Sequence, residues 1–248
     1  MFSCLVSLEE LYINDNPPLT VIKVGTFEGL SSLKILHLVR CGLKSLEAGF
    51  FSDLGSLESL WIGYIPMLTV LEVGTFYGLS SLRVLEAYDC GLKSLEASLF
   101  ADMVSLEELQ LREMLSLTTL EVGSFDGLSS LKKLDVNMCG LEGLKSGLFS
   151  GLGSLEELQL HHMPLLLSLE VGTFDGLTSL KVLNMYKCGF LPLGAGLFSG
   201  LGTLENVLMF DNPASMSLEV GLFDGIDCQN VVFFESSEVS GGDVCEGV

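Results

Sequence analysis

The chain has 248 residues, of which 48% are hydrophobic and 18% charged, and its 32 acidic against 12 basic residues give a formal net charge of −20. Nucleic acids and anionic membranes bind clustered Lys and Arg, so this balance argues against both as partners. The apolar runs are short and interrupted by Glu, Gly or Ser, so no segment is expected to insert into a membrane.

From its first residues the chain repeats one pattern. Met1 leads directly into a strand-like segment without a leader sequence, so we expect a mature or trimmed segment. Each repeat opens with LxxLxLxx followed by Asn or Cys, and the steps between repeats alternate between 25 and 24 residues. A fixed period of this size predicts a solenoid. The leading leucines are Leu8, Leu33, Leu57, Leu82, Leu106, Leu131, Leu155, Leu180 and Leu204, and a weaker tenth repeat starts at Cys228.

The second half of each repeat is equally regular. A phenylalanine recurs there at one place in every coil, which predicts a column of stacked rings inside the convex side. Its members are Phe27, Phe51, Phe76, Phe100, Phe125, Phe149, Phe174, Phe198 and Phe223.

These patterns predict an α/β-type repeat solenoid, a leucine-rich-repeat horseshoe. One parallel sheet of about ten short strands is expected on its concave face, with mostly irregular or short-helical arcs on the convex side. We assign residues 1–226 to the solenoid, as about nine repeats grouped in a 49-residue super-repeat, and residues 227–248 to a C-terminal capping segment or tail.

The half-repeat GLKSLEAGFFSDLGSLESL has Gly49, Phe51 and Leu54 at fixed places. It resembles the "typical" subfamily of animal extracellular leucine-rich-repeat proteins, which includes Toll-like receptor ectodomains and the variable lymphocyte receptors of jawless fishes. The resemblance covers about residues 5–226 and implies an extracellular recognition protein, secreted or the ectodomain of a longer receptor. The cysteine-rich flanking caps of that subfamily are not recognisable here. The proline that usually follows the arc leucine is replaced by Glu or Lys, as at Glu47, Glu72, Glu96 and Glu121.

The seven cysteines divide into two groups. Four recur every 49 residues at the interior Asn/Cys position and are expected to be buried free thiols that fill space, because coils two apart are too distant for a disulfide. They are Cys41, Cys90, Cys139 and Cys188. Cys228 and Cys245 are candidates for a disulfide that would hold the C-terminal segment, while Cys4 is either the remnant of a cap or a free thiol.

No motif indicates catalysis or a cofactor. The sequence has no GxSxG, HExxH, P-loop or CxxC spacing, so we expect neither an enzyme nor a metal site. His161 and His162 are adjacent in a strand, and strand alternation predicts that they point to opposite sides or splay apart.

One outward column of the predicted sheet alternates in charge without interruption. Opposite charges on neighbouring strands attract, so we interpret this column as a structural charge ladder that sets the pairing of coils. The ladder consists of Glu9, Lys34, Glu58, Arg83, Glu107, Lys132, Glu156, Lys181 and Glu205.

The other outward columns differ between otherwise similar repeats. Exposed Trp, Tyr and Arg are typical anchors of binding interfaces. The ligand-binding candidates on the concave face are Arg40, Trp61, Tyr64, Tyr88 and Arg112. A second group is either a self-association site or a seal against a folded-back tail or a second molecule, and comprises Tyr186, Phe210 and Phe234.

Two functions follow as hypotheses. The first is a non-enzymatic recognition module of the immune-receptor kind that presents its concave face to a protein or a glycan. The second is a self-associating structural or adhesive protein, a homodimer, because the mean hydropathy of +0.52 is high and the last coils lack a polar cap.

Overall fold

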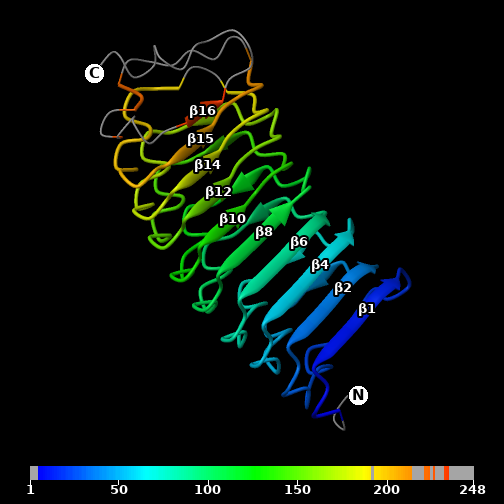
Figure 1. Ribbon diagram of the computed structural model, residues 1–248. Helices are drawn as coiled ribbons and strands as arrows, with labels where there is room; N and C mark the ends of the chain where they lie inside the picture. The colour runs from blue at the N-terminus through cyan, green and yellow to red at the C-terminus, as the bar shows by residue number, and fades with distance from the viewer. Residues whose placement is uncertain (1–4, 191–192, 214–220, 224–225, 227–231, 235–248) are drawn as a thin grey trace.

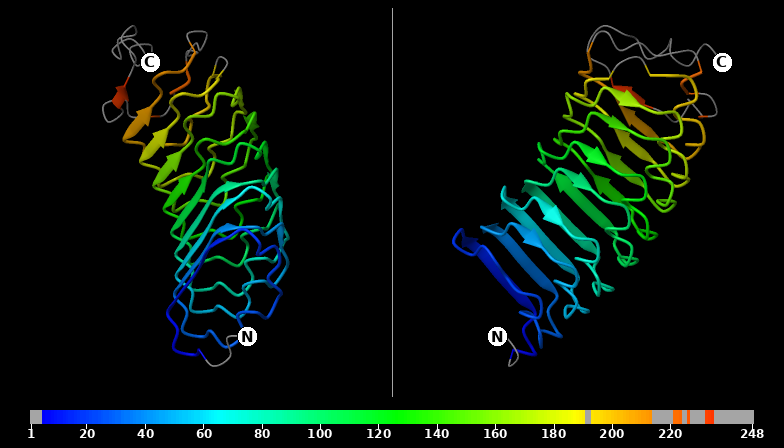
Figure 2. Two further views of the ribbon diagram at one scale, coloured as in Figure 1. Left: turned by 90° about the vertical axis from the view of Figure 1, so that its right-hand side faces the viewer. Right: turned by 180° about the vertical axis from the view of Figure 1, so that it is seen from behind.

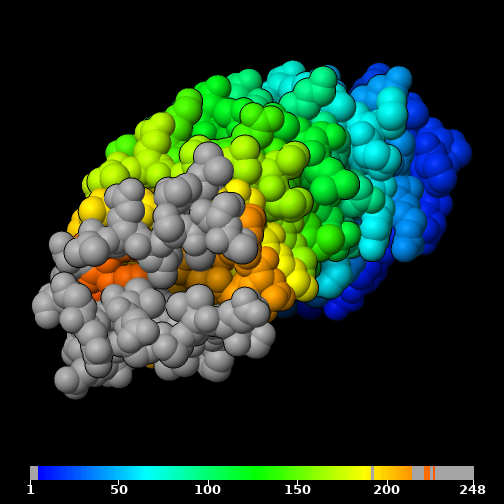
Figure 3. All heavy atoms as spheres, turned by 90° about the horizontal axis from the view of Figure 1, so that it is seen from above, coloured from blue at the N-terminus to red at the C-terminus, as the bar shows by residue number. Residues whose placement is uncertain are grey.

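The computed structural model describes residues 5–190, 193–213, 221–223, 226 and 232–234. The chain forms an elongated solenoid in which the coils follow one another in chain order, with β1 and β16 at opposite ends (Figure 1). Strands line one side and returning arcs the other (Figure 2). Seen from above, successive coils occupy successive positions along the molecule (Figure 3). The predicted solenoid is confirmed.

One parallel sheet of ten strands runs through the molecule, as predicted, and each strand pairs with those of the neighbouring coils. Its outward side, predicted as the concave face, is called the sheet face below. In sheet order the strands are β1 (Glu10–Asn16), β2 (Ile35–Cys41), β4 (Ser59–Ile65), β6 (Val84–Cys90), β8 (Glu108–Arg112), β10 (Lys133–Asp135), β12 (Glu157–Gln159), β14 (Val182–Asn184), β15 (Asn206–Leu208) and β16 (Val232–Phe234).

The strands shorten along the chain. The first four have seven residues each, and the strands from β10 onward have three. At the end of β10 the Asp135 Oδ1 accepts hydrogen bonds from the backbone N–H of Asn137 at 3.2 Å and from its Nδ2 at 2.7 Å. The backbone still bonds to the next coil beyond Asp135, from the Val136 N–H to the Gln159 carbonyl at 2.9 Å and from the Met138 N–H to the His161 carbonyl at 3.2 Å.

The arcs consist of turns, and the residues described contain no helix. Three short ladders join the arcs in pairs, so hydrogen bonds on this side follow the 49-residue period rather than the single coil. In each pair a Thr or Ser hydroxyl also donates to the preceding coil, as Thr75 does to the Leu46 carbonyl at 2.8 Å. The paired segments are β3 (Ser45–Leu46) with β5 (Val70–Leu71), β7 (Ser94–Leu95) with β9 (Thr119–Leu120), and β11 (Gly143–Leu144) with β13 (Ser168–Leu169).

The core is one continuous cluster of leucines with the phenylalanine column beside it. From Phe51 to Phe223 consecutive rings are stacked, with centroid separations between 5.3 and 6.4 Å. All nine column residues are at most 5% exposed. The predicted column of stacked rings is therefore confirmed from Phe51 onward, and we call it the phenylalanine spine.

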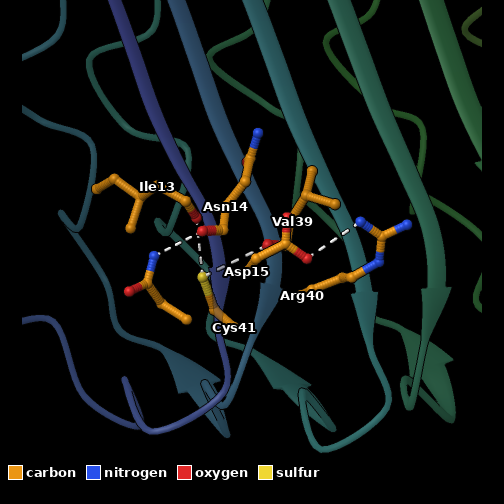
Figure 4. A network of polar contacts seen from close by, with 7 residues as sticks. Ile13, Asn14, Asp15, Val39, Arg40 and Cys41 are labelled. Atoms are coloured by element: carbon orange, nitrogen blue, oxygen red, sulfur yellow. Dashed lines mark hydrogen bonds and ion pairs between the residues drawn. The ribbon is translucent and has the colours of Figure 1, made fainter.

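The four periodic cysteines are buried free thiols, as predicted, but they are more than space-filling groups. The Sγ of Cys41 donates to the Ile13 carbonyl of the preceding coil at 3.0 Å (Figure 4). At the equivalent place Asn212 Nδ2 donates to the Met185 carbonyl at 3.0 Å. At this position the cysteine thiol thus donates the same hydrogen bond as the asparagine amide, but a weaker one. Burial raises the pKa of Cys139 to about 12, so that thiol stays protonated.

In each of nine coils, one residue near the C-terminal end of the sheet strand has a left-handed backbone conformation. All have φ between 48° and 59°, although none is glycine. This conformation turns the chain out of the strand and into the arc, at a cost of about 1–2 kcal/mol for residues with a Cβ. The left-handed column consists of Asp15, Arg40, Tyr64, Asp89, Glu113, Met138, His162, Lys187 and Asp211.

Two predictions concern parts of the chain that the structure does not describe. Most of segment 227–248, with its boundary to the solenoid and the Cys228–Cys245 pair, lies outside the described residues, and so does Cys4. In the described residues no helix has the length and apolarity required to cross a bilayer.

Candidate functional site

The charge ladder runs across the base of the sheet face. Lys34 pairs with Glu9 at 3.2 Å, and Lys181 pairs with Glu156 at 2.6 Å. Glu107 receives two partners, Arg83 at 2.6 Å and Lys132 at 2.9 Å, which lower the pKa of its carboxyl. These groups are largely exposed, so each pair contributes little stability, and a role in setting register remains our proposal. Ladder residues also line a shallow groove of about 440 Å³.

The N-terminal part of the sheet face carries a row of aromatic rings. His37 stacks on Trp61 with ring centroids 4.4 Å apart and planes at 7°. Tyr12 meets His37 edge-on at 4.6 Å, and its hydroxyl donates to Glu10 at 2.7 Å. The three rings belong to β1, β2 and β4, whose register places them directly opposite one another. Burial lowers the pKa of His37, so this ring favours the neutral form.

Beside this row lies a second group, which we call the tyrosine cluster: Arg40, Tyr64 and Tyr88. The Arg40 guanidinium carbon sits 5.0 Å from the centre of the Tyr64 ring, and Tyr64 meets Tyr88 edge-on at 5.0 Å. Arg40 also pairs with Asp15 at 3.2 Å (Figure 4). Two of the three stand in the left-handed column, which carries their side chains to the edge of the sheet face.

Gly63 explains how Tyr88 is held. The two residues face each other in the register of β4 and β6. A Cβ on Gly63 would lie 2.4 Å from the Cζ of Tyr88, so the ring occupies the space that any other residue would fill. Burial raises the pKa of Tyr88, consistent with a ring seated against the backbone. The cluster is therefore preformed.

The middle of the sheet face is polar. Arg112 pairs with Glu86 at 3.4 Å. Burial raises the pKa values of Glu86 and of Asp135, against the opposing effect of Arg112. Further along, Asn184 donates to Gln159, while the buried Oδ1 of Asn184 accepts no hydrogen bond from the residues described.

The C-terminal part of the sheet face has a second aromatic row. His161 stacks on Tyr186 at 4.5 Å, and Tyr186 stacks on Phe210 at 4.4 Å. The prediction that Phe234 continues this row was wrong, because the register of β15 and β16 places Phe234 opposite Leu208 rather than Phe210. Its side chain lies outside the described residues. Burial, with His162 and Lys187 nearby, lowers the pKa of His161 to about 4, so its ring is neutral at pH 7.

The prediction that His161 and His162 point apart was wrong. Their Nδ1 atoms are 2.9 Å from each other. Strand alternation fails here because His162 is in the left-handed column, with φ of 55°, and its side chain turns back toward its neighbour. The residues described contain no group of three or more His, Cys, Asp or Glu arranged to hold a metal ion.

The structure thus arranges the five ligand-binding candidates in three neighbouring groups. Arg40, Tyr64 and Tyr88 are in contact, Trp61 belongs to the aromatic row, and Arg112 is tied to Glu86. Sequence reasoning missed Tyr12, His37 and Gly63. The signals were present, because aromatic residues occupy the middle of three successive strands and a glycine stands opposite Tyr88.

A family model described as "Leucine rich repeat" matches residues 6–64, 88–141 and 129–190. No match to a curated protein was found.

Several solved structures share the fold. A chain of the Drosophila Toll–Spatzle complex in its glycosylated form has a TM-score of 0.71 at 21% identity, covering 90% of this chain and 28% of that one. A chain of the TLR13–ssRNA13 complex has a TM-score of 0.58 at 25% identity, covering 94% of this chain and 40% of that one. A further structure of the Toll–Spatzle complex has a TM-score of 0.63 at 22% identity, covering 88% and 31%. The chain therefore spans less than half the length of these structures.

Proposed function

Because this chain belongs to the leucine-rich-repeat family, we propose that it is a non-enzymatic, receptor-like recognition module that acts outside the cell. It presents the N-terminal part of its sheet face to a protein or a glycan. The solved structures of similar fold support a recognition role, since one holds a Toll–Spatzle complex and another a complex with single-stranded RNA.

The observation that carries this proposal is the preformed tyrosine cluster with the adjoining aromatic row. Tyr64 remains 41% exposed, although it contacts both Arg40 and Tyr88. Aromatic and Arg side chains held in fixed positions lose little conformational freedom on binding. Gly63 holds Tyr88 against the backbone, and the stack of His37 on Trp61 holds the indole. The surface therefore combines aromatic area with directed donors at a low entropic cost.

The ligand class follows from the same residues. An aromatic ring beside the guanidinium of Arg40 suits a sugar ring or an apolar protein side chain next to a hydrogen-bond acceptor. The net charge of −20 opposes a polyanion, which is why we favour protein or glycan. The fold itself does not exclude nucleic acid, because a chain of similar fold forms the TLR13–ssRNA13 complex. The expected exclusion of nucleic acid is therefore not supported.

The proposal is tested by screening the protein against arrays of glycans and extracellular proteins, with single-stranded RNA as a third arm. Binding should be lost on Trp61→Ala and on Arg40→Gln. The matched control is Lys44→Gln, on the exposed arc. A ligand whose affinity is unchanged by every sheet-face substitution would place recognition elsewhere, and selective binding of RNA would replace the proposed ligand class.

Self-association is the second candidate. It rests on the stacked row of His161, Tyr186 and Phe210, in which the last two rings are partly exposed at the C-terminal end of the sheet face. A homodimer that joined these rows would cover them. Sedimentation equilibrium distinguishes the outcomes: a dimer that Phe210→Glu dissociates supports self-association, and a monomer at all concentrations excludes it.

A further inference from the structure

A groove at the edge of the sheet, where the strands turn into the arcs, is set apart from the rest of the molecule by its lining. Its volume is about 480 Å³, within the range of small-molecule sites. The wall is mostly apolar, and three of its large side chains are unusually exposed: Leu115 at 77%, Leu165 at 55% and Met138 at 42%. The lining residues are Leu115, Met138, Cys139, Gly140, His162, Pro164, Leu165 and Lys187.

The only charged side chain in this lining is basic. Lys187 forms no ion pair in the part of the chain that the structure describes, and no acidic residue lines the groove. The backbones of both polar residues are anchored, because the N–H of Lys187 donates to the Phe210 carbonyl at 3.1 Å and that of His162 to the Tyr186 carbonyl at 3.0 Å. An ammonium group and an imidazole therefore lie beside an apolar wall, and the imidazole is held by contacts with His161 Nδ1 at 2.9 Å and with the Tyr186 ring at 5.1 Å.

In the preceding 49-residue copy, the positions equivalent to the groove lining carry different residue types. There Asp89 stands for Met138, Glu113 for His162 and Ser116 for Leu165. The position of Lys187 is taken by Met138 itself. One copy thus carries two carboxylates where the next carries an apolar wall and basic groups. In a chain with a net charge of −20, this local reversal is not explained by solubility.

We infer that this groove binds an amphipathic anion, a small molecule with an apolar chain and a carboxylate or phosphate head. The chain lies against Leu115, Met138 and Leu165. The head pairs with Lys187 and accepts a hydrogen bond from His162, since charge-assisted bonds next to apolar surface are the strong ones. A cation at one end of an apolar groove selects such a ligand over neutral or cationic ones. This site is independent of the tyrosine cluster and requires no partner there.

The test uses a dansylated undecanoic acid as fluorescent probe, with dodecanoate, dodecyl phosphate and dodecanol as competitors below their micellar concentrations. Two variants copy the preceding repeat, Lys187→Met and Leu165→Ser, so both residues are already compatible with this coil. Lys44→Met, on the exposed arc, is the matched control for loss of a lysine charge. Thermal unfolding of each variant verifies that it remains folded.

The expected result is probe binding that dodecanoate or dodecyl phosphate displaces at least about tenfold more effectively than dodecanol. Lys187→Met should weaken binding of the anions about tenfold and that of dodecanol much less, while Leu165→Ser weakens all three. The two anions distinguish a carboxylate head from a phosphate head. Equal displacement by dodecanol, or equal losses in Lys44→Met and Lys187→Met, would each overturn the inference.

Discussion

The phenylalanine spine and the sheet face are both columns of side chains that pass through every coil, but they differ in how far the copies vary. The spine keeps one residue type, with stacked rings from Phe51 to Phe223. The middle of the sheet face changes from Tyr12, His37 and Trp61 to Glu86 within four strands. A spine residue has neighbours on all sides, so a change leaves a cavity, whereas a face residue has solvent on one side. Binding chemistry can therefore diversify at exposed positions and not in the spine.

The largest expected effect comes from breaking the spine. Phe125→Ala should lower the free energy of unfolding by about 3–5 kcal/mol, because it opens a cavity between Phe100 and Phe149. Tyr64→Ala, on the sheet face, should cost about 1 kcal/mol or less. Urea unfolding followed by circular dichroism measures both. Equal losses would show that the face is as constrained as the interior.

The next largest effect concerns His161, a residue of the sheet face whose pKa is lowered by burial as that of an interior residue would be. The folded pKa of His161 is about 4 against 6.5 in the unfolded chain, so as pH falls from 6.5 to 4 the unfolded state takes up a proton that the folded state refuses. Stability should fall by about 1–2 kcal/mol over that window, a value reduced for solvent screening of a half-buried group. Unfolding at several pH values measures it.

The control for this pH dependence is His161→Gln. The variant should lose the slope between pH 6.5 and 4 and keep the losses at lower pH, where Glu107 and Glu156, with lowered pKa values, become protonated. A slope that persists in the variant would assign the effect to another group.

A smaller effect concerns one left-handed position of the arcs, where a single copy lacks the glycine that the others have. Ser98 has φ of 62°, while Gly49, Gly147 and Gly196 hold the equivalent positions with φ of 72–75°. Ser98→Gly should raise the free energy of unfolding by about 0.5–1 kcal/mol, since it removes left-handed strain at some entropic cost. Thermal unfolding checks it. The reverse change, Gly147→Ser, should destabilise by a similar amount. Destabilisation by Ser98→Gly or stabilisation by Gly147→Ser would refute the strain argument.

The smallest change in stability is expected at Gly63. In Gly63→Ala the new methyl group displaces the Tyr88 ring, the far end of a flexible side chain, so the free energy of unfolding should change by less than about 1 kcal/mol. The ring itself should become exposed. Nitration of Tyr88 by tetranitromethane, followed by mass spectrometry, should be several times faster than in the parent, with Tyr64 as internal reference. An unchanged rate would contradict the role of Gly63 in seating the ring.

Much of this architecture could be predicted from the sequence, because many copies of one pattern identify the inward positions more clearly than a single copy does. Nine leading leucines and nine phenylalanines at regularly alternating spacing predict the parallel sheet, the spine and the buried thiols. The same period explains the alternation of the charge ladder. Less could be read of the sheet face, where the residue types predict candidates but not contacts. Trp61 stacks on His37 rather than joining Tyr64, although Tyr64 is much closer in sequence, because strand register places His37 directly opposite Trp61.

The sequence by itself determined the order of the coils, the inward and outward positions and the interior, because these follow from a period that each copy repeats. Tertiary structure decided what a periodic pattern cannot encode. The left-handed turn at His162 brings its Nδ1 to that of His161. Gly63 makes room for Tyr88. Each depends on one backbone angle or one side chain meeting the next coil, and such contacts arise only once the coils are stacked.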